Sequence, residues 1–292
     1  MEYVIYIALI LLGVCLGSFA GATTWRLRAR QLAYDKAHKE TIDEHEYKRL
    51  KPLAHRKLSK DRSQCLHCGY KLTWRDLIPI VSWVSLKGKC RECKKPIGYF
   101  ELLIEIGVAV FFVASYAFWP FGPIDTGIEI ARFIVWLVAG VILAILTAYD
   151  TKWYLLPDKL TMILTGLGVV SVILAAVSSF DPAGLLLSTL GAVGILSGLY
   201  LVLYVASKGR WIGFGDIKLG LGLALLLGDW GLAIIALFLA NLIGCLIVIP
   251  FMIKGTLKRD SHVPFGPLLI IGTVLAFFIG PPLVELYAFG LI

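Results

Sequence analysis

Long apolar runs separated by short polar segments dominate the chain. Apolar stretches long enough to cross a bilayer lie near 3–25, 102–120, 128–149, 159–179, 184–206, 231–253 and 266–290. A shorter run, 216–228, follows Asp216 and completes a further span only if residues 213–215 are counted with it. We therefore expect an all-α polytopic membrane protein with about eight transmembrane helices, the sixth of them short.

The composition agrees with this pattern. Hydrophobic residues make up 58% of the chain and charged residues only 16%, whereas soluble domains are about 25% charged. The first apolar run is expected to be a retained helix rather than a cleaved signal peptide. It has no basic segment before it, and it is longer than the apolar core of such peptides.

Basic residues are concentrated on one side of the predicted spans. Segment 26–97 holds 19 of the 28 Lys and Arg residues against 8 acidic residues. The remaining interhelical loops alternate between basic ones (150–158, 207–215 and 254–264) and ones without Lys or Arg (121–127, 180–183 and 229–230). Because positively charged loops stay in the cytoplasm, we expect the basic loops there and both termini outside.

The large basic segment is expected to contact membrane lipids, because anionic headgroups attract juxtamembrane Lys and Arg clusters. Nucleic acid is not an expected partner, since aromatic and basic residues do not interleave as they do on a nucleic-acid-binding face. Residues 30–60 are charged and poor in large apolar side chains. We expect them to form an exposed helix or a mobile arm.

Four cysteines form two pairs, "CLHC" (65–68) and "CREC" (90–93), separated by 21 residues. Two such pairs can close a tetrahedral structural zinc site. A disulfide pairing is the alternative, but the expected cytoplasmic position is reducing. The sequence therefore predicts zinc bound by Cys65, Cys68, Cys90 and Cys93, with His67 as a bystander.

Two aspartates stand at the ends of apolar runs on the cytoplasmic side. Asp150 ends the third span and Asp216 begins the sixth. Ionisable groups at such a depth point to function, although both could be interfacial charges or helix caps. Asp158 is expected to be the N-cap of the fourth span. In "GFGD" (213–216), the two glycines are expected to allow close approach and positive φ beside the carboxylate.

If the third and sixth spans are neighbours, Asp150 and Asp216 can share a proton. One would then act as general base on a water while the other polarises a carbonyl. Alternatives of other classes are a proton- or cation-coupled transporter and a scaffold that displays a zinc domain. The glycines of 219–228 lie within a span, so they are expected to pack helices rather than bind a nucleotide.

Several segments, taken in order, resemble the bacterial type IV prepilin peptidases, also called leader peptidases of prepilin-like proteins. Besides the two CxxC pairs, they are "GSFAGATTWRL" (17–27), "IPIVSWVSLKGKCRECKKPI" (78–97), "YDTKWYLLPDKL" (149–160), "GFGDIKLGLGLALLLG" (213–228) and "VPFGPLLIIG" (263–272). The resemblance runs from the first span to the last.

The resemblance implies a bacterial inner-membrane aspartic endopeptidase whose catalytic residues map to Asp150 and Asp216. Its substrates would be pilin-like precursors, cleaved after a glycine where the short basic leader meets the hydrophobic stem. Many family members also N-methylate the new amino terminus with S-adenosylmethionine, an activity associated with the first cytoplasmic loop. This chain departs from the family there: Gly21 replaces an asparagine, and "FELLIE" (100–105) keeps only Glu105 of "RYPxVE".

We expect three parts: a first transmembrane helix (1–25), a basic cytoplasmic loop with a zinc-binding subdomain (26–100), and a seven-helix aspartic peptidase domain (101–292). The zinc would be structural, because the hydrolysis outlined above needs no metal. A peptidase without methyltransferase activity is the nearest alternative.

Overall fold

The structure, a computed structural model, describes residues 2–54, 62–255 and 263–288. Within these ranges the named elements are all helical, and the only other pairings are two isolated β-bridges. The expected all-α fold is therefore confirmed. Most of the basic loop 254–264 lies outside the described residues.

The chain forms two compact units, Met1–Ala114 and Ser115–Ile292. The first contains α1 (Glu2–Ala37), α2 (Glu44–Ala54), η2 (Trp74–Leu77), α3 (Val81–Ser85) and most of α4 (Phe100–Ala117). The second contains α5 (Gly127–Trp153), α6 (Asp158–Ser178), α7 (Pro182–Val193), η3 (Gly194–Gly198), α8 (Leu199–Ser207), α9 (Phe214–Leu227), α10 (Trp230–Ile253) and α11 (Phe265–Ala288). The sequence-based division into three parts stays a prediction.

Seven described helices are long and apolar enough to cross a membrane. They are α1, α4, α5, α6, the continuous run α7–η3–α8, α10 and α11. The helix α9, predicted as the short sixth span, has 14 residues, which is about 21 Å of helix. It therefore falls short of the roughly 30 Å hydrocarbon core.

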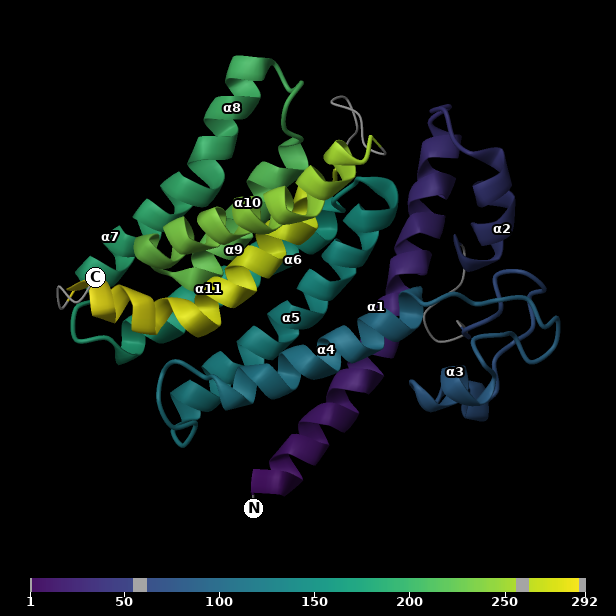
Figure 1. The fold of residues 1–292 in the computed structure, drawn as a ribbon, viewed down its shortest axis with the longest axis horizontal. Helices are drawn as coiled ribbons and strands as arrows, with labels where there is room; N and C mark the ends of the chain where they lie inside the picture. The colour runs from purple at the N-terminus through teal and green to yellow at the C-terminus, as the bar shows by residue number, and fades with distance from the viewer. Residues whose placement is uncertain (1, 55–61, 256–262, 289–292) are drawn as a thin grey trace. The chain divides into compact units, whose positions relative to one another are not determined.

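Helix α1 of the first unit is longer than its predicted span and makes two kinds of contact. A Cβ atom on Gly13 or Gly17 would lie 2.6 Å from a backbone Cα of α4, at Ala109 or Glu105. These glycines therefore allow close helix packing, as small residues do in membranes. Figure 1 shows α2 beside the C-terminal part of α1.

The contact between α1 and α2 has its own apolar core. Ala29 and Leu32 of α1 are buried against Leu50 and Leu53 of α2. Of the segment expected to be an exposed helix or a mobile arm, residues 30–37 and 44–54 are helical, but they also bury apolar side chains that the charged sequence did not reveal. Residues 55–61 lie outside the described part of the chain.

In the second unit, α9 is enclosed by other helices. Most of its length is buried, and it packs against α6, α7, η3 and α11. A Cβ on Gly222 would lie 2.9 Å from Cδ2 of Leu164 in α6, and one on Gly220 would collide with the carbonyl oxygen of Leu196 in η3. The glycines of this run therefore serve helix packing, as predicted. In Figure 1, α10 and α11 lie side by side.

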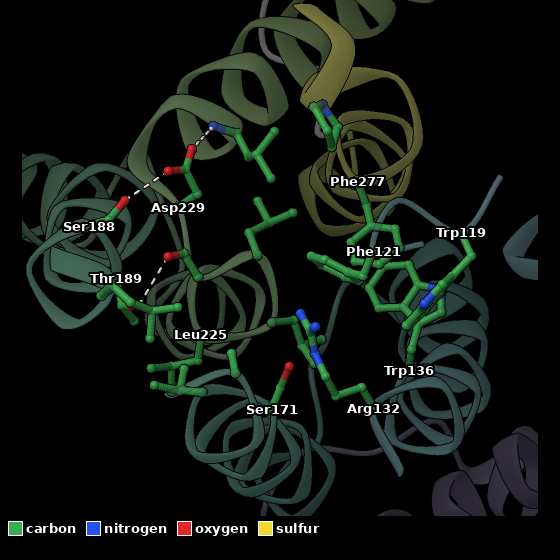
Figure 2. A pocket seen from close by; sticks show the side chains of 18 residues that line it. Trp119, Phe121, Arg132, Trp136, Ser171, Ser188, Thr189, Leu225, Asp229 and Phe277 are labelled. Atoms are coloured by element: carbon green, nitrogen blue, oxygen red, sulfur yellow. Dashed lines mark hydrogen bonds between the residues drawn. The ribbon is translucent and has the colours of Figure 1, made fainter. Parts of the chain in front are cut away.

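A cavity of about 350 Å³ lies at the C-terminal end of α9. Figure 2 shows aromatic side chains on one of its sides and Ser188 hydrogen-bonded to Asp229 on another. Arg132 lines the cavity, but its guanidinium already pairs with Glu129 at 2.8 Å. Because Asp216 lies in the first turn of α9, the cavity is at the opposite end of this helix.

Candidate active site and candidate metal centre

Asp150 lies in the last full turn of α5 and is 6% exposed. Its carboxylate accepts a hydrogen bond from the backbone N–H of Gly266, at the start of α11. A Cβ on Gly266 would lie 2.6 Å from Oδ2 of Asp150, so any larger residue would displace this carboxylate. The position is unfavourable for a negative charge, because a helix dipole is negative at its C-terminal end.

Asp216 lies in the first turn of α9, three positions after the N-cap residue Gly213. Its carboxylate accepts a hydrogen bond from the N–H of Gly213. In a capping box, the acidic side chain at the third helical position accepts the same hydrogen bond from the N-cap N–H. Asp216 is therefore not the N-cap, and the dipole at this end of the helix favours its negative charge.

The two glycines of "GFGD" matter because they are small and not because they adopt unusual dihedral angles. The expectation of positive φ was wrong, because Gly213 has φ −75° and Gly215 is helical. The expected close approach is present: a Cβ on Gly215 would lie 3.1 Å from Cβ of Leu156. The glycine therefore lets the start of α9 lie against the segment between α5 and α6.

The structure brings Asp150 and Asp216 within range of electrostatic interaction. The end of α5 and the start of α9 are linked through α11, which packs against both helices. Asp150 is buried and Asp216 is partly buried. Two carboxylates in such surroundings can share one proton, which gives an acid and a base in one site.

Asp158 is not the N-cap that the sequence suggested. Helix α6 begins at Asp158 itself after Pro157, without a side-chain cap. Its carboxylate instead pairs with Nζ of Lys218 in α9 at 2.7 Å, and the Asp158 side chain is 67% exposed. Exposed pairs of this kind contribute little, about 0–1 kcal/mol.

Gly266 was missed as a site residue by sequence reasoning. Its segment "VPFGPLLIIG" (263–272) served only to identify a resemblance. The available signal was a glycine followed by proline at the start of an apolar run. Which carboxylate the Gly266 N–H meets depends on how α11 packs, and no local pattern reveals that.

The four predicted cysteine ligands do come together. The Sγ atoms of Cys65, Cys68, Cys90 and Cys93 all lie within 4.8 Å of one another. The pairs Cys65–Cys93 and Cys68–Cys90 are 3.9 and 4.0 Å apart, far beyond a disulfide bond of about 2.0 Å. Sulfurs around a tetrahedral zinc, each about 2.3 Å from the ion, lie about 3.8 Å apart. The donor set therefore fits a metal ion.

The two cysteine pairs have matching local geometry. Each begins with a turn in which the N–H four residues on donates to the first cysteine's carbonyl, from Gly69 to Cys65 and from Lys94 to Cys90. Gly69 and Lys94 both have positive φ, 72° and 57°. Each turn is closed by an isolated β-bridge, Gln64 with Lys71 and Lys89 with Pro96.

The environments of the thiols differ within the cluster. Burial raises the pKa of the Cys65 thiol to about 12. Burial also opposes ionisation of Cys90, but backbone N–H groups of Cys93 and Glu92 lower the pKa of its thiol to about 7.

An ion pair joins the second cysteine turn to η2. Nε of Arg91 donates to Oδ1 of Asp76 at 2.7 Å, and the Asp76 side chain is only 3% exposed. Oδ2 of Asp76 accepts from the hydroxyl and the N–H of Thr73. Burial alone would raise the pKa of Asp76, but the hydrogen bonds from Thr73 and Arg91 outweigh it and hold this pKa below its usual value.

Glu105 lies at a second polar centre of the first unit. Its buried carboxylate accepts hydrogen bonds from the Ser18 side chain and, at 2.7 Å, from the N–H of Ile80. Ile80 has φ 59°, which is strained for a β-branched residue and typical of functional or switch regions. A Cβ on Gly21 would meet only side-chain atoms at 3.8 Å, an ordinary contact, so this position can accept a Cβ atom.

Comparison with known proteins covers both units. Residues 11–119 match the bacterial peptidase A24 N-terminal domain, and residues 137–249 match the type IV leader peptidase family. No solved structure matches the chain.

Similar curated proteins are named prepilin leader peptidase/N-methyltransferase. The one from Dichelobacter nodosus is 30% identical over 78% of this chain and 74% of its own length. Those from Aeromonas hydrophila and Pseudomonas aeruginosa are 28% and 29% identical, over 97% and 95% of this chain and 94% and 91% of their own lengths. With seven apolar helices and both matched domains, the chain belongs to the type IV leader peptidase family of multi-pass membrane proteins.

Proposed function

We propose that this protein is a membrane aspartic endopeptidase that removes the short basic leader of type IV prepilin-like proteins at the cytoplasmic membrane boundary. Asp150 and Asp216 would be its catalytic pair. The main support is that two carboxylates from distant segments lie within electrostatic range in largely buried surroundings. Family membership and the names of the relatives support the substrate class.

The surroundings of the two carboxylates suggest different roles. Asp216, at a helix N-terminus, would be the ionised base that takes a proton from water. Asp150, at a helix C-terminus, would be protonated and would hydrogen-bond the scissile carbonyl oxygen. The Gly266 N–H would hold the Asp150 carboxyl group in place. As the C–N bond breaks, the proton on Asp216 would pass to the leaving amine.

Cleavage of a purified pilin-like precursor by the Asp150→Asn and Asp216→Asn variants tests this assignment. Each substitution should lower kcat by about 10²- to 10⁴-fold, because it removes an acid–base group. Asp158→Asn is the matched control, since its exposed carboxylate only pairs with Lys218. Cleavage at the wild-type rate in either active-site variant would disprove the catalytic assignment.

We infer a second activity, N-methylation of the new amino terminus with S-adenosylmethionine as methyl donor. It is supported by the match of residues 11–119 and by the relatives' names. The buried Glu105 carboxylate and the strained backbone of Ile80 in the first unit support a functional centre there. Mass analysis of the mature amino terminus, after cleavage with S-adenosylmethionine present, should show one added methyl group. An unmodified terminus after complete cleavage would contradict this inference.

We propose that the four-cysteine cluster binds a structural zinc ion. The donor set and the sulfur spacing support zinc. The metal would tie the segment before η2 to the segment after α3 and take no part in hydrolysis. Metal analysis of the purified protein is the test, and iron in place of zinc would overturn the identity of the ion.

We also propose an inner-membrane location with the basic segment 26–100 and both aspartates on the cytoplasmic side. The support is the charge segregation of the loops. A cysteine introduced at Thr126, in a loop without Lys or Arg, should react with an impermeant thiol reagent added to intact cells. Labelling only after cell lysis would contradict the proposed orientation and indicate the opposite one.

A further inference from the structure

Tyr200, near the start of α8, has a buried hydroxyl group that the mechanism above leaves unused. The residue is only 4% exposed, and among the described residues its hydroxyl oxygen has no hydrogen-bond partner. Buried tyrosine hydroxyls are normally paired, because an unpaired buried donor is destabilising. The fold therefore tolerates an unfavourable group at this position.

The surroundings of Tyr200 belong to the candidate active site. Its phenol group interacts electrostatically with Asp216. Its ring makes an edge contact with Phe265, with ring centroids 5.6 Å apart. Phe265 directly precedes Gly266, whose N–H binds Asp150. Tyr200 is thus within electrostatic range of Asp216 and packs beside the residue that precedes the Asp150 partner, Gly266.

A local irregularity sets the position of Tyr200. The preceding segment, η3, is a π-helical turn, and such turns occur frequently at functional sites. The hydroxyl of Ser197 in η3 donates to the carbonyl of Ile217, the residue after Asp216, at 3.1 Å. Leu196 meets α9 at Gly220 with no space for a side chain there. These contacts fix the start of α8 against the first turns of α9.

We propose that Tyr200 is a third catalytic residue, whose hydroxyl donates a hydrogen bond to the oxygen of the scissile carbonyl. This inference rests on the proposed peptidase function. When water adds to the carbonyl carbon, its proton passes to Asp216 and the carbonyl π electrons move to oxygen. The Tyr200 hydroxyl stabilises that growing charge together with Asp150. Collapse then breaks the C–N bond, and the amine takes the proton from Asp216.

Tyr200→Phe is the informative substitution, because it keeps the ring contact with Phe265 and removes only the hydroxyl. We expect kcat for precursor cleavage to fall by about 10²- to 10³-fold, the usual effect of losing one oxyanion donor. KM should stay unchanged, because the bond matters mainly in the transition state. The melting temperature of the full chain in detergent should stay the same or rise, because an unpaired donor disappears.

The control is Tyr204→Phe, which removes a hydroxyl one turn later in α8 from a partly exposed tyrosine packed on Phe214. It should keep wild-type kcat. An active Tyr200→Phe variant would overturn the inference, and so would parallel losses of activity and thermal stability, since these indicate a structural role. If Asp150→Asn and Asp216→Asn fail to cleave the precursor while Tyr200→Phe cleaves it normally, the catalytic role of Tyr200 is rejected and the proposed peptidase function stands. Full cleavage by the aspartate variants would reject the proposed function itself.

Discussion

The cysteine cluster and the aspartate pair reach their geometry by different routes. The four cysteines lie between positions 65 and 93, and two short turns with nearly identical hydrogen bonds present them to one point. The aspartate pair draws on three helices, α5, α9 and α11, that are far apart in the sequence. One site is thus assembled locally and the other by tertiary packing.

This difference determines how each site should respond to damage. The cysteine cluster depends on donor atoms, so removal of one donor should abolish metal binding. The aspartate pair depends on close backbone approach as well, so a single methyl group in the wrong place should disturb it. Three substitutions, taken in order of expected effect, separate the two kinds of site.

Cys90→Ser should have the largest effect on the locally built site. Cys90 is the buried member of the cluster, and three thiolates cannot complete a four-cysteine site. The zinc content of the purified protein should fall from about one ion per chain to near zero. Elemental analysis measures this, with Cys15→Ser as the control outside the cluster. A variant that retains its full zinc content would show that the metal lies elsewhere.

Gly266→Ala should damage the aspartate pair and leave the metal centre intact. The added Cβ would lie 2.6 Å from Oδ2 of Asp150, so the carboxylate has to move. A displacement of about 1 Å in an active site can lower the rate about 10²-fold, and we expect that loss in kcat. Gly166→Ala is the matched control, because its Cβ would have no neighbour within 4 Å. Unchanged cleavage by Gly266→Ala would mean that the Gly266 contact is dispensable.

Asp76→Asn should have a smaller effect, on metal affinity. Asp76 holds Arg91, which lies between two cysteine ligands, and loss of such outer partners typically lowers metal affinity about 10- to 100-fold. Competition with a chromogenic chelator measures the change, with the exposed Glu92→Gln as control. Equal zinc affinity in Asp76→Asn and wild type would show that this ion pair has no role in metal binding.

The pH dependence of this ion pair has a definite sign. Because the folded protein lowers the pKa of Asp76, its stabilising contribution is complete above the unfolded pKa of about 4. It is lost as pH falls through the lower folded-state value. The difference in thermal stability between wild type and Asp76→Asn should therefore be constant at neutral pH and shrink below about pH 4.

The sequence was most informative where the determining forces are local. Apolar length predicted the seven long helices, and cysteine spacing predicted which thiols meet. Asp158 was misassigned as a cap because nothing near it in the sequence reveals Lys218 as its partner. The glycines of "GFGD" were assigned the wrong backbone conformation, since local sequence does not separate close approach from positive φ.

Tertiary contacts explain what the sequence did not reveal. Leu50 and Leu53 of α2 lie in a highly charged segment. Their role as core residues is evident only from their packing against α1. The roles of Gly266 and Tyr200 likewise depend on where α11 and α8 lie relative to the aspartates. The two aspartates could therefore be singled out from the sequence, whereas the groups that surround them could not.

The hydrogen bond from Gly266 to Asp150 also has a consequence for biosynthesis. Gly266 follows Asp150 by 116 residues and Asp216 by 50 residues, so both aspartates are synthesised before it. At bacterial elongation rates this delay is on the order of ten seconds. For the last 50 residues of that interval, the nascent chain carries both aspartates but lacks the backbone N–H that binds Asp150. The hydrogen bond that holds Asp150 can therefore form only after residues 151–266 have been synthesised.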